Sequence, residues 1–132
     1  MNKILSTLLL VILLYSCKKD DDPKPSESFT GQWKLVEQVG GIEGWNTRIS
    51  ADTVILLTLT NNSSFYRKFN GKIIGQGSYQ ISTQSSNFND NSGRAISFNN
   101  SALWQFINIK NDTLTLTDPY PDGFSLIYVK AR

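Results

Sequence analysis

The 132-residue chain has no histidine and a single cysteine, Cys17. The lack of histidine excludes His-based acid–base catalysis and most zinc sites, and one thiol cannot form a disulfide within the chain. Basic and acidic residues nearly balance, 13 against 11, whereas a nucleic-acid-binding domain carries a clear basic excess. The composition therefore predicts no nucleic-acid partner, and we expect no metal ion and no cofactor.

An activated nucleophile is also missing. The serines have no histidine partner, and none lies in a G-x-S-x-G turn. Asp118 and Asp122 flank the segment "DPYPDG", but its prolines and glycine favour a turn over a pair of catalytic carboxylates. We therefore expect that the chain is not an enzyme.

One long apolar run is present, at residues 4–15, and it is interrupted only by Ser6 and Thr7. As a helix this run would span about 18 Å, which is short of the ~30 Å hydrocarbon core of a bilayer. Together with the preceding Lys3, it is typical of a secretory signal peptide, which we place at residues 1–16. A retained membrane-anchoring helix is the alternative.

The apolar run ends in Leu14-Tyr15-Ser16-Cys17, which resembles the lipobox of bacterial lipoproteins. The resemblance implies cleavage after Ser16 and attachment of a diacylglyceryl group to the sulfur of Cys17. Each buried methylene contributes ~0.8 kcal/mol, so two or three acyl chains would hold a small domain on a bilayer. We therefore expect an outer-membrane lipoprotein whose first partner is the membrane.

Residues 17–28, "CKKDDDPKPSES", are rich in charge, proline and serine. Such a segment cannot build a core and is expected to form a flexible tether. Its order resembles the export signal of surface lipoproteins in Bacteroidetes, which implies that Lys18, Lys19 and residues 20–22 direct the protein to the cell surface. A plain solvated spacer is the alternative.

Residues 29–132 show no helical period, and short β-branched and aromatic runs alternate with Asn, Gly, Asp and Ser clusters. The Asn70-Gly71 pair predicts a hairpin turn, and residues 40–52 are expected to form a long loop. No crossover helix is available, so the strands should pair antiparallel. The predicted strands cover residues 33–39, 53–60, 64–69, 73–82, 94–98, 103–109, 113–117 and 124–132.

Eight antiparallel strands in one domain can form a sandwich or close into an up-and-down barrel. The alternation of Ile55, Leu57 and Leu59 with polar neighbours indicates one buried face. Closure would remove both edge strands, which otherwise invite aggregation. We therefore predict an all-β, eight-stranded antiparallel up-and-down barrel, either filled by side chains or holding one small ligand.

The start of this domain, Gly31-Gln32-Trp33, resembles the G-x-W signature of lipocalins. The pieces that follow in order are similar to the small lipocalin-like, calycin-type domains of Bacteroidetes lipoproteins: Leu57 and Leu59 with Phe65, Gly77 and Tyr79, Leu114 and Leu116, and Tyr128 with Lys130. The resemblance implies that Trp33 packs at the closed end of a barrel beneath a basic side chain, Lys130 or Arg132. Such a cation–π contact contributes ~0.5–2 kcal/mol.

Several aromatic residues are candidates for ligand contact, with the tyrosine hydroxyls orienting a guest. The candidates to line a cavity are Phe65, Tyr79, Trp104, Phe106, Phe124 and Tyr128. The alternative is that these side chains only fill the barrel. Trp45 stands apart in the Gly-rich loop, as a plug over the barrel mouth or as an exposed contact.

Two functions remain open from the sequence. The first is binding of a small apolar or amphipathic molecule in the barrel of a lipid-anchored protein. The second is a surface interaction module with a filled barrel, whose loops around Trp45 and residues 83–93 bind a protein or a glycan.

Two triplets, Asp52-Thr53-Val54 and Asp112-Thr113-Leu114, resemble the O-glycosylation acceptor pattern of Bacteroidetes. The resemblance implies that Thr53 and Thr113 are modified in such a host, with coincidence as the alternative.

Overall fold

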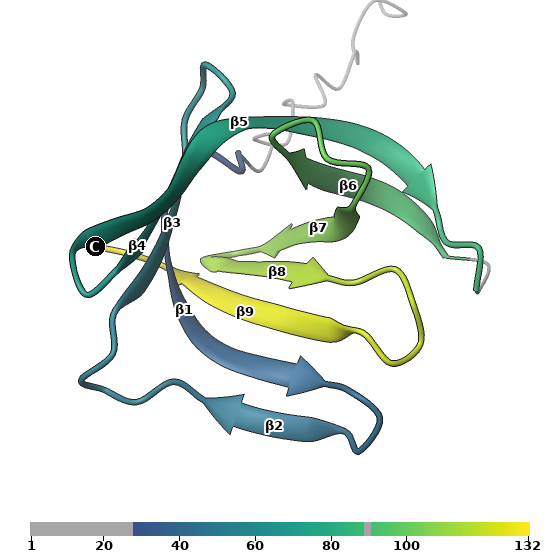
Figure 1. The fold of residues 1–132 in the computed structure, drawn as a ribbon, viewed down its shortest axis with the longest axis horizontal. Coiled ribbons are helices and arrows are strands. Elements are labelled where there is room, and N and C mark those ends of the chain that lie inside the picture. The colour runs from purple at the N-terminus through teal and green to yellow at the C-terminus, as the bar shows by residue number, and fades with distance from the viewer. Residues whose placement is uncertain (1–27, 89–90) are drawn as a thin grey trace, which may run out of the picture.

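The computed structural model describes residues 28–88 and 91–132. The predicted signal peptide, Cys17 and nearly all of the predicted tether lie outside the described residues. The elements are β1 (Gly31–Gly40), β2 (Trp45–Arg48), β3 (Ile55–Leu59), β4 (Ser64–Phe69), β5 (Lys72–Ser85), β6 (Ser92–Phe98), β7 (Trp104–Lys110), β8 (Thr113–Thr117) and β9 (Phe124–Lys130) (Figure 1). Across these two ranges we find no helix with the length and apolarity needed to span a membrane.

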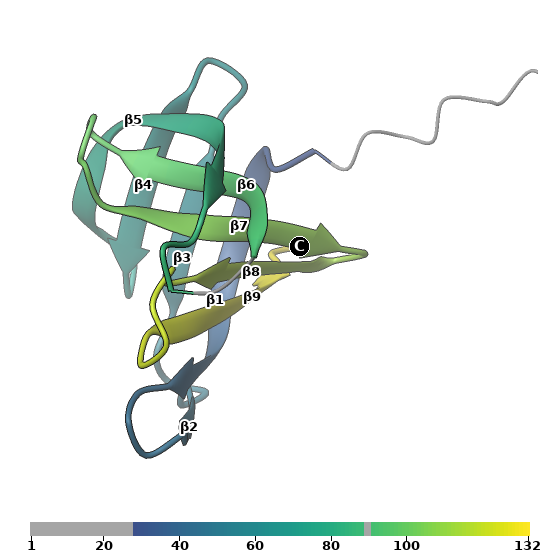
Figure 2. The same ribbon diagram turned by 90° about the vertical axis from the view of Figure 1, so that its right-hand side faces the viewer.

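The nine strands form one antiparallel sheet that closes on itself. Their order is β2-β1-β3-β4-β5-β6-β7-β8-β9, and β1 also pairs with β9 along its length. Strands β1 and β3–β9 therefore make a closed eight-stranded barrel (Figures 1 and 2). This confirms the predicted all-β fold and decides for the barrel over the sandwich.

Strand β2 is an addition to the barrel, in a segment that the sequence predicted as loop. Residues 31–34 of β1 pair with β3, whereas residues 37–40 pair with β2 on the same edge. Figure 2 shows β2 extending away from the barrel body. The turn between β1 and β2 uses Gly41 and Gly44, both with positive φ (81° and 64°), and Gly44 N donates to Gly41 O at 3.0 Å. These glycines allow the chain to reverse tightly.

Strand β5 is longer than predicted, and its two halves pair with different neighbouring strands of the barrel. Its first half pairs with β4 and its second half, residues 79–85, pairs with β6. In Figure 1 the strand arches over the other elements. Because all the pairings that close the barrel join residues between Gly31 and Lys130, we expect the chain to fold without residues 1–17.

The barrel interior is filled with packed side chains. The core cluster consists of Trp33, Leu35, Leu57, Leu59, Phe65, Tyr79, Ile96, Ile107, Ile109, Leu114, Leu116 and Tyr128. Arg67 also reaches into it, with its guanidinium carbon 4.4 Å from the ring centroid of Phe98. Trp33 is fully buried, and its indole Nε1 donates to Phe29 O at 2.9 Å. The inward alternation that predicted the barrel thus builds a packed core, and one of its members, Ile96, also borders a hollow of about 470 Å³.

Candidate binding site at the β1–β2 hairpin

Three neighbouring strands bring Trp45 and Phe124 to either side of Gly40. Gly40 of β1 is opposite Trp45 of β2 on one edge and opposite Phe124 of β9 on the other. Directly opposed residues of antiparallel strands project from the same face of the sheet. Both aromatic side chains therefore belong to one face, and the position between them carries no side chain.

Two consecutive glycines in β1 and its turn let the β8–β9 loop and the Phe124 ring approach closely. Gly40 and Gly41 have backbone φ angles of 122° and 81°, which residues other than glycine rarely adopt. A Cβ on Gly40 would lie 2.3 Å from Gly123 O, and a Cβ on Gly41 would lie 3.2 Å from Cζ of Phe124. A larger residue at either position would therefore displace the β8–β9 loop or the Phe124 ring.

The result is a hollow between the β1–β2 hairpin and the β8–β9 loop, which we call the hairpin pocket. Its volume is about 660 Å³, within the range of about 300–1,000 Å³ usual for small-molecule sites. Its apolar lining comes from Ile42, Trp45 and Phe124. Trp45 is 62% exposed and Ile42 is 88% exposed, so the pocket presents large apolar groups to solvent.

The polar groups of the hairpin pocket are all neutral or acidic. They come from Gln38, Glu43, Thr47 and Asp122, and no lysine or arginine lines the pocket. Glu43 Oε2 accepts a hydrogen bond from Trp45 Nε1 at 3.0 Å. This bond orients the indole ring and places a carboxylate at the rim of the site.

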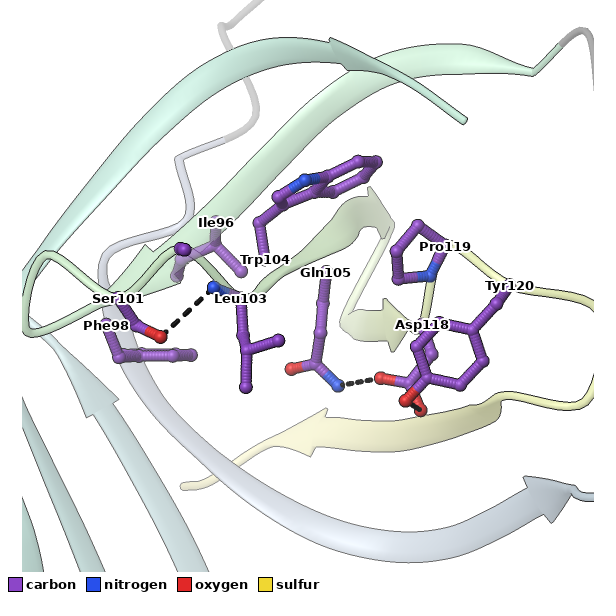
Figure 3. A pocket seen from close by; sticks show the side chains of 10 residues that line it. Ile96, Phe98, Ser101, Leu103, Trp104, Gln105, Asp118, Pro119 and Tyr120 are labelled. Atoms are coloured by element: carbon purple, nitrogen blue, oxygen red, sulfur yellow. Dashed lines mark hydrogen bonds between the residues drawn. The ribbon is translucent and has the colours of Figure 1, made fainter. Parts of the chain in front are cut away.

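Asp118 organises the β8–β9 loop, residues 118–123, which forms one wall of the pocket. Its Oδ2 accepts hydrogen bonds from Phe124 N at 2.9 Å and from the Tyr120 hydroxyl at 3.2 Å, and its Oδ1 accepts one from Gln105 Nε2 at 2.9 Å (Figure 3). The charge of Asp118 raises the pKa of Tyr120, with smaller contributions from desolvation and from their hydrogen bond. The "DPYPDG" segment is a turn, as its composition predicts, and the hydrogen bonds to Asp118 hold this turn in place.

A second hollow, of about 470 Å³, lies on the other side of the β8–β9 loop. Phe98, Leu103 and Trp104 are among its lining residues, together with Gln105 and Asp118. Figure 3 shows the Gln105 amide turned toward the Asp118 carboxylate, while Trp104 points away from that pair. Because the amide and the carboxylate are already bonded to each other, this hollow offers a ligand fewer uncommitted polar groups than the hairpin pocket does.

Three of the aromatic candidates, Phe65, Tyr79 and Tyr128, are buried members of the core. The Tyr79 hydroxyl donates to Thr60 O at 2.7 Å. Burial raises the pKa of Tyr79 and of Tyr128, and the nearby Arg67 opposes the rise for Tyr128. These side chains line neither the hairpin pocket nor the second hollow, so packing is the role that the structure shows for them.

The candidates Trp104 and Phe106 form an edge-to-face pair with ring centroids 5.0 Å apart. Trp104 lines the second hollow, whereas Phe106 lines a third one of about 420 Å³ between β6 and β7. Neither lines the hairpin pocket. Of the aromatic residues singled out in the sequence, Trp45 and Phe124 are those that line the hairpin pocket together.

The residues of the lipocalin-like motif lie where the chain enters and leaves the barrel. Gly31 is the first residue of β1, and Lys130 Nζ lies 5.8 Å from the ring centroid of Trp33. Arg132 is exposed at the end of the chain. Of the two basic residues considered, Lys130 is the one that the structure places over the tryptophan.

Thr53 and Thr113 are both half-buried. Thr53 N donates to Ser50 O at 3.0 Å in the segment before β3, and Thr113 begins β8. Among the described residues no group of three or more Cys, Asp or Glu side chains is arranged to hold a metal ion.

No pattern in the sequence marked four of the pocket residues as binding residues, namely Gln38, Ile42, Glu43 and Thr47. The available clue was the "GG" pair at 40–41, which permits a close approach of neighbouring strands.

Comparison of the chain with protein-family models, with curated proteins and with solved structures finds no match.

Proposed function

We propose that this chain is a lipid-anchored cell-envelope protein that binds a small apolar or amphipathic molecule in the hairpin pocket, without catalysing a reaction. The lipid anchor rests on the lipobox-like sequence at Cys17. The binding function rests on one observation: the exposed Trp45 ring, hydrogen-bonded to Glu43, lines the same pocket as Phe124 and Gly41. Because packed side chains fill the barrel centre, we expect the ligand to bind in the hairpin pocket instead.

The lining of the pocket defines the ligand further. Apolar contacts with Trp45, Ile42 and Phe124 favour an alkyl chain or a ring, since each buried methylene contributes ~0.8 kcal/mol. Glu43 and Asp122 supply negative charge, and no basic lining residue balances it. An anionic head group would therefore be repelled, whereas a neutral hydroxyl-rich or a cationic head group would be accepted.

The second function, a surface module for a protein or glycan, is supported by the filled barrel and by the exposure of Ile42 and Trp45. It uses the same surface but needs no enclosed guest. The two functions differ in whether an isolated small amphiphile binds, and in whether the β5–β6 loop takes part.

The test is calorimetric titration of the chain from Lys18 onward with three amphiphiles of one alkyl length, below their micelle concentrations. The amphiphiles are an alkyl glucoside, an alkyltrimethylammonium salt and a fatty acid. The variants are Trp45→Ala and Phe124→Ala, and the matched control is Phe88→Ala. Phe88 is 65% exposed, close to the 62% of Trp45, but it lies in the β5–β6 loop.

We expect the glucoside and the ammonium salt to bind more tightly than the fatty acid. Loss of either pocket ring should weaken binding by about tenfold or more, because each ring contributes contact area and stacking. The control variant should bind like the wild type. Failure of all three amphiphiles to bind would contradict the pocket function, and a protein or glycan partner lost in both Trp45→Ala and Phe88→Ala would support the second.

A further inference from the structure

The tip of the hairpin formed by β4 and β5 carries large apolar side chains in solvent. We call residues 66–74 the β4–β5 tip. Ile73 is 48% exposed and Ile74 is 61% exposed, and Tyr66 and Phe69 are exposed as well. The turn itself is Asn70-Gly71, with φ of 46° and 82°, the two-residue hairpin turn that favours this pair. Figure 1 places the tip at the opposite end of β5 from the β5–β6 loop.

A β-bulge accounts for two adjacent exposed isoleucines. Lys68 is opposite Ile73 and Arg67 is opposite Gly75, so Ile74 is the extra residue on its strand. In a regular strand, successive side chains point to opposite faces, and one of the two isoleucines would turn toward the barrel interior. The bulge breaks this alternation and re-aims a side chain. Both isoleucines thus remain outside the core.

The charged residues within the tip itself are all basic, whereas Asp52 lies two residues before Val54, whose backbone N and O are both hydrogen-bonded to Asn70. Residues 53–89 contain Arg67, Lys68 and Lys72 but no aspartate or glutamate. Arg67 is directed into the barrel, over the rings of Phe65 and Phe98. The two lysines lie on opposite faces of the hairpin, because Lys72 shares a face with Phe69 opposite it and Lys68 shares the other face with Ile73.

We propose that the β4–β5 tip inserts into the head-group region of an anionic lipid bilayer. Exposed clusters of large apolar residues mark interaction sites, and this cluster sits on a projecting turn that can enter a lipid surface. Lysine stems can lie along apolar groups while their ammonium groups reach the phosphates. Each lysine near an anionic surface contributes a factor of about five in affinity. This proposal does not depend on the hairpin pocket.

The test is co-sedimentation of the chain from Lys18 onward, which lacks the apolar run and Cys17, with vesicles of a neutral lipid or of the same lipid mixed with an anionic one. The apolar variant is Ile73→Ser with Ile74→Ser. Its control is Phe88→Ser, which alters a large apolar residue of similar exposure (65%) outside both the tip and the hairpin pocket. The charge variant is Lys68→Gln with Lys72→Gln, and its control is Lys34→Gln with Lys110→Gln.

We expect the wild type and both controls to bind anionic vesicles, and added salt to weaken this binding. The apolar variant should lose binding by about tenfold, and the charge variant by about twenty-fivefold, from about fivefold per lysine. Circular dichroism should show all variants folded, since the changed side chains lie outside the core. Wild type that stays in solution with anionic vesicles would overturn the proposal, as would equal binding by tip variants and controls. A dimer that the apolar variant abolishes, without vesicle binding, would assign the tip to a second copy of the chain instead.

Discussion

Replacing Asp118 by alanine should remove three hydrogen bonds at the base of the β8–β9 loop. The donors are Gln105 Nε2, Phe124 N and the Tyr120 hydroxyl. The loop would then lose its connection to β7 and to the start of β9. Because Phe124 forms one side of the hairpin pocket, the change should affect both stability and binding.

The size of the stability loss follows from the number and exposure of these bonds. Hydrogen bonds to charged groups contribute about 1.5–3 kcal/mol, and neutral ones about 0.5–1.5 kcal/mol. The bond from Gln105 is partly buried, whereas the bonds from Phe124 and Tyr120 are exposed. We therefore count about 1.5 kcal/mol for the Gln105 bond, about 0.5–1.5 kcal/mol for the Phe124 bond and nothing for the longer Tyr120 bond. The expected loss is about 2–3 kcal/mol, or a fall in Tm of about 10–20 °C for a domain of this size.

Thermal and denaturant unfolding measure this loss. Asp122→Ala is the matched control, because it removes an acidic side chain from the same loop without removing any of the three bonds. Asp118→Asn should fall between the two, since its amide oxygen can still accept from Phe124 N. Ultraviolet titration of Asp118→Ala should also show the pKa of Tyr120 returning toward its ordinary value. An Asp118→Ala protein as stable as the Asp122→Ala control would refute the reasoning.

Three further changes test other parts of the molecule. Burial raises the pKa of Tyr128 above its unfolded value of 10.0; the folded state therefore holds this proton more tightly, and stability falls as the pH rises above 10. Denaturant titrations on both sides of that pH should show a smaller fall for Tyr128→Phe. Gly41→Ala should weaken amphiphile binding, whereas Gly71→Ala should leave that binding unchanged. The two glycines have similar φ angles, 81° and 82°, so each substitution should lower the free energy of unfolding by about 1 kcal/mol or more. Lys130→Met should lower it by about 0.5–1 kcal/mol, the value for a cation–π contact of an exposed cation. Arg132→Met should leave it unchanged, as thermal unfolding will show.

The barrel strands were predictable because their signals are local. The predicted strands at 64–69 and 113–117 have the bounds of β4 and β8, since each combines alternating side chains with a short polar turn. The Asn70-Gly71 turn was recognisable from two residues alone. Closure of the sheet followed from strand number and from the lack of any crossover helix.

Strand β2 could not be found in this way. Its sequence, WNTR, has one apolar residue and no alternation, so it is a strand because β1 offers an open edge after the turn at Gly41. The extra length of β5 likewise depends on a partner, since residues 79–85 are strand only through pairing with β6. Pairing of this kind is a tertiary effect that overrides local preference.

Only the aromatic members of the candidate site were predictable, and their assembly was not. Trp45 and Phe124 were recognisable as aromatic residues in or beside loops. Their meeting across Gly40 depends on the register of three strands that lie far apart in the sequence, and a shift of one residue would turn one ring to the other face. For Phe65 and Tyr128, inward alternation is the same in a filled barrel as in a hollow one, so only the packed structure shows that they belong to the core.

Native mass spectrometry tests the central claim most directly. The chain from Lys18 onward should be produced in the organism that supplied the sequence and purified without detergent, as wild type, Trp45→Ala and Phe88→Ala. The account predicts a small-molecule adduct on the wild type and on Phe88→Ala that is lost from Trp45→Ala. Bare protein in all three samples, or an adduct that persists in Trp45→Ala, would contradict a ligand site in the hairpin pocket.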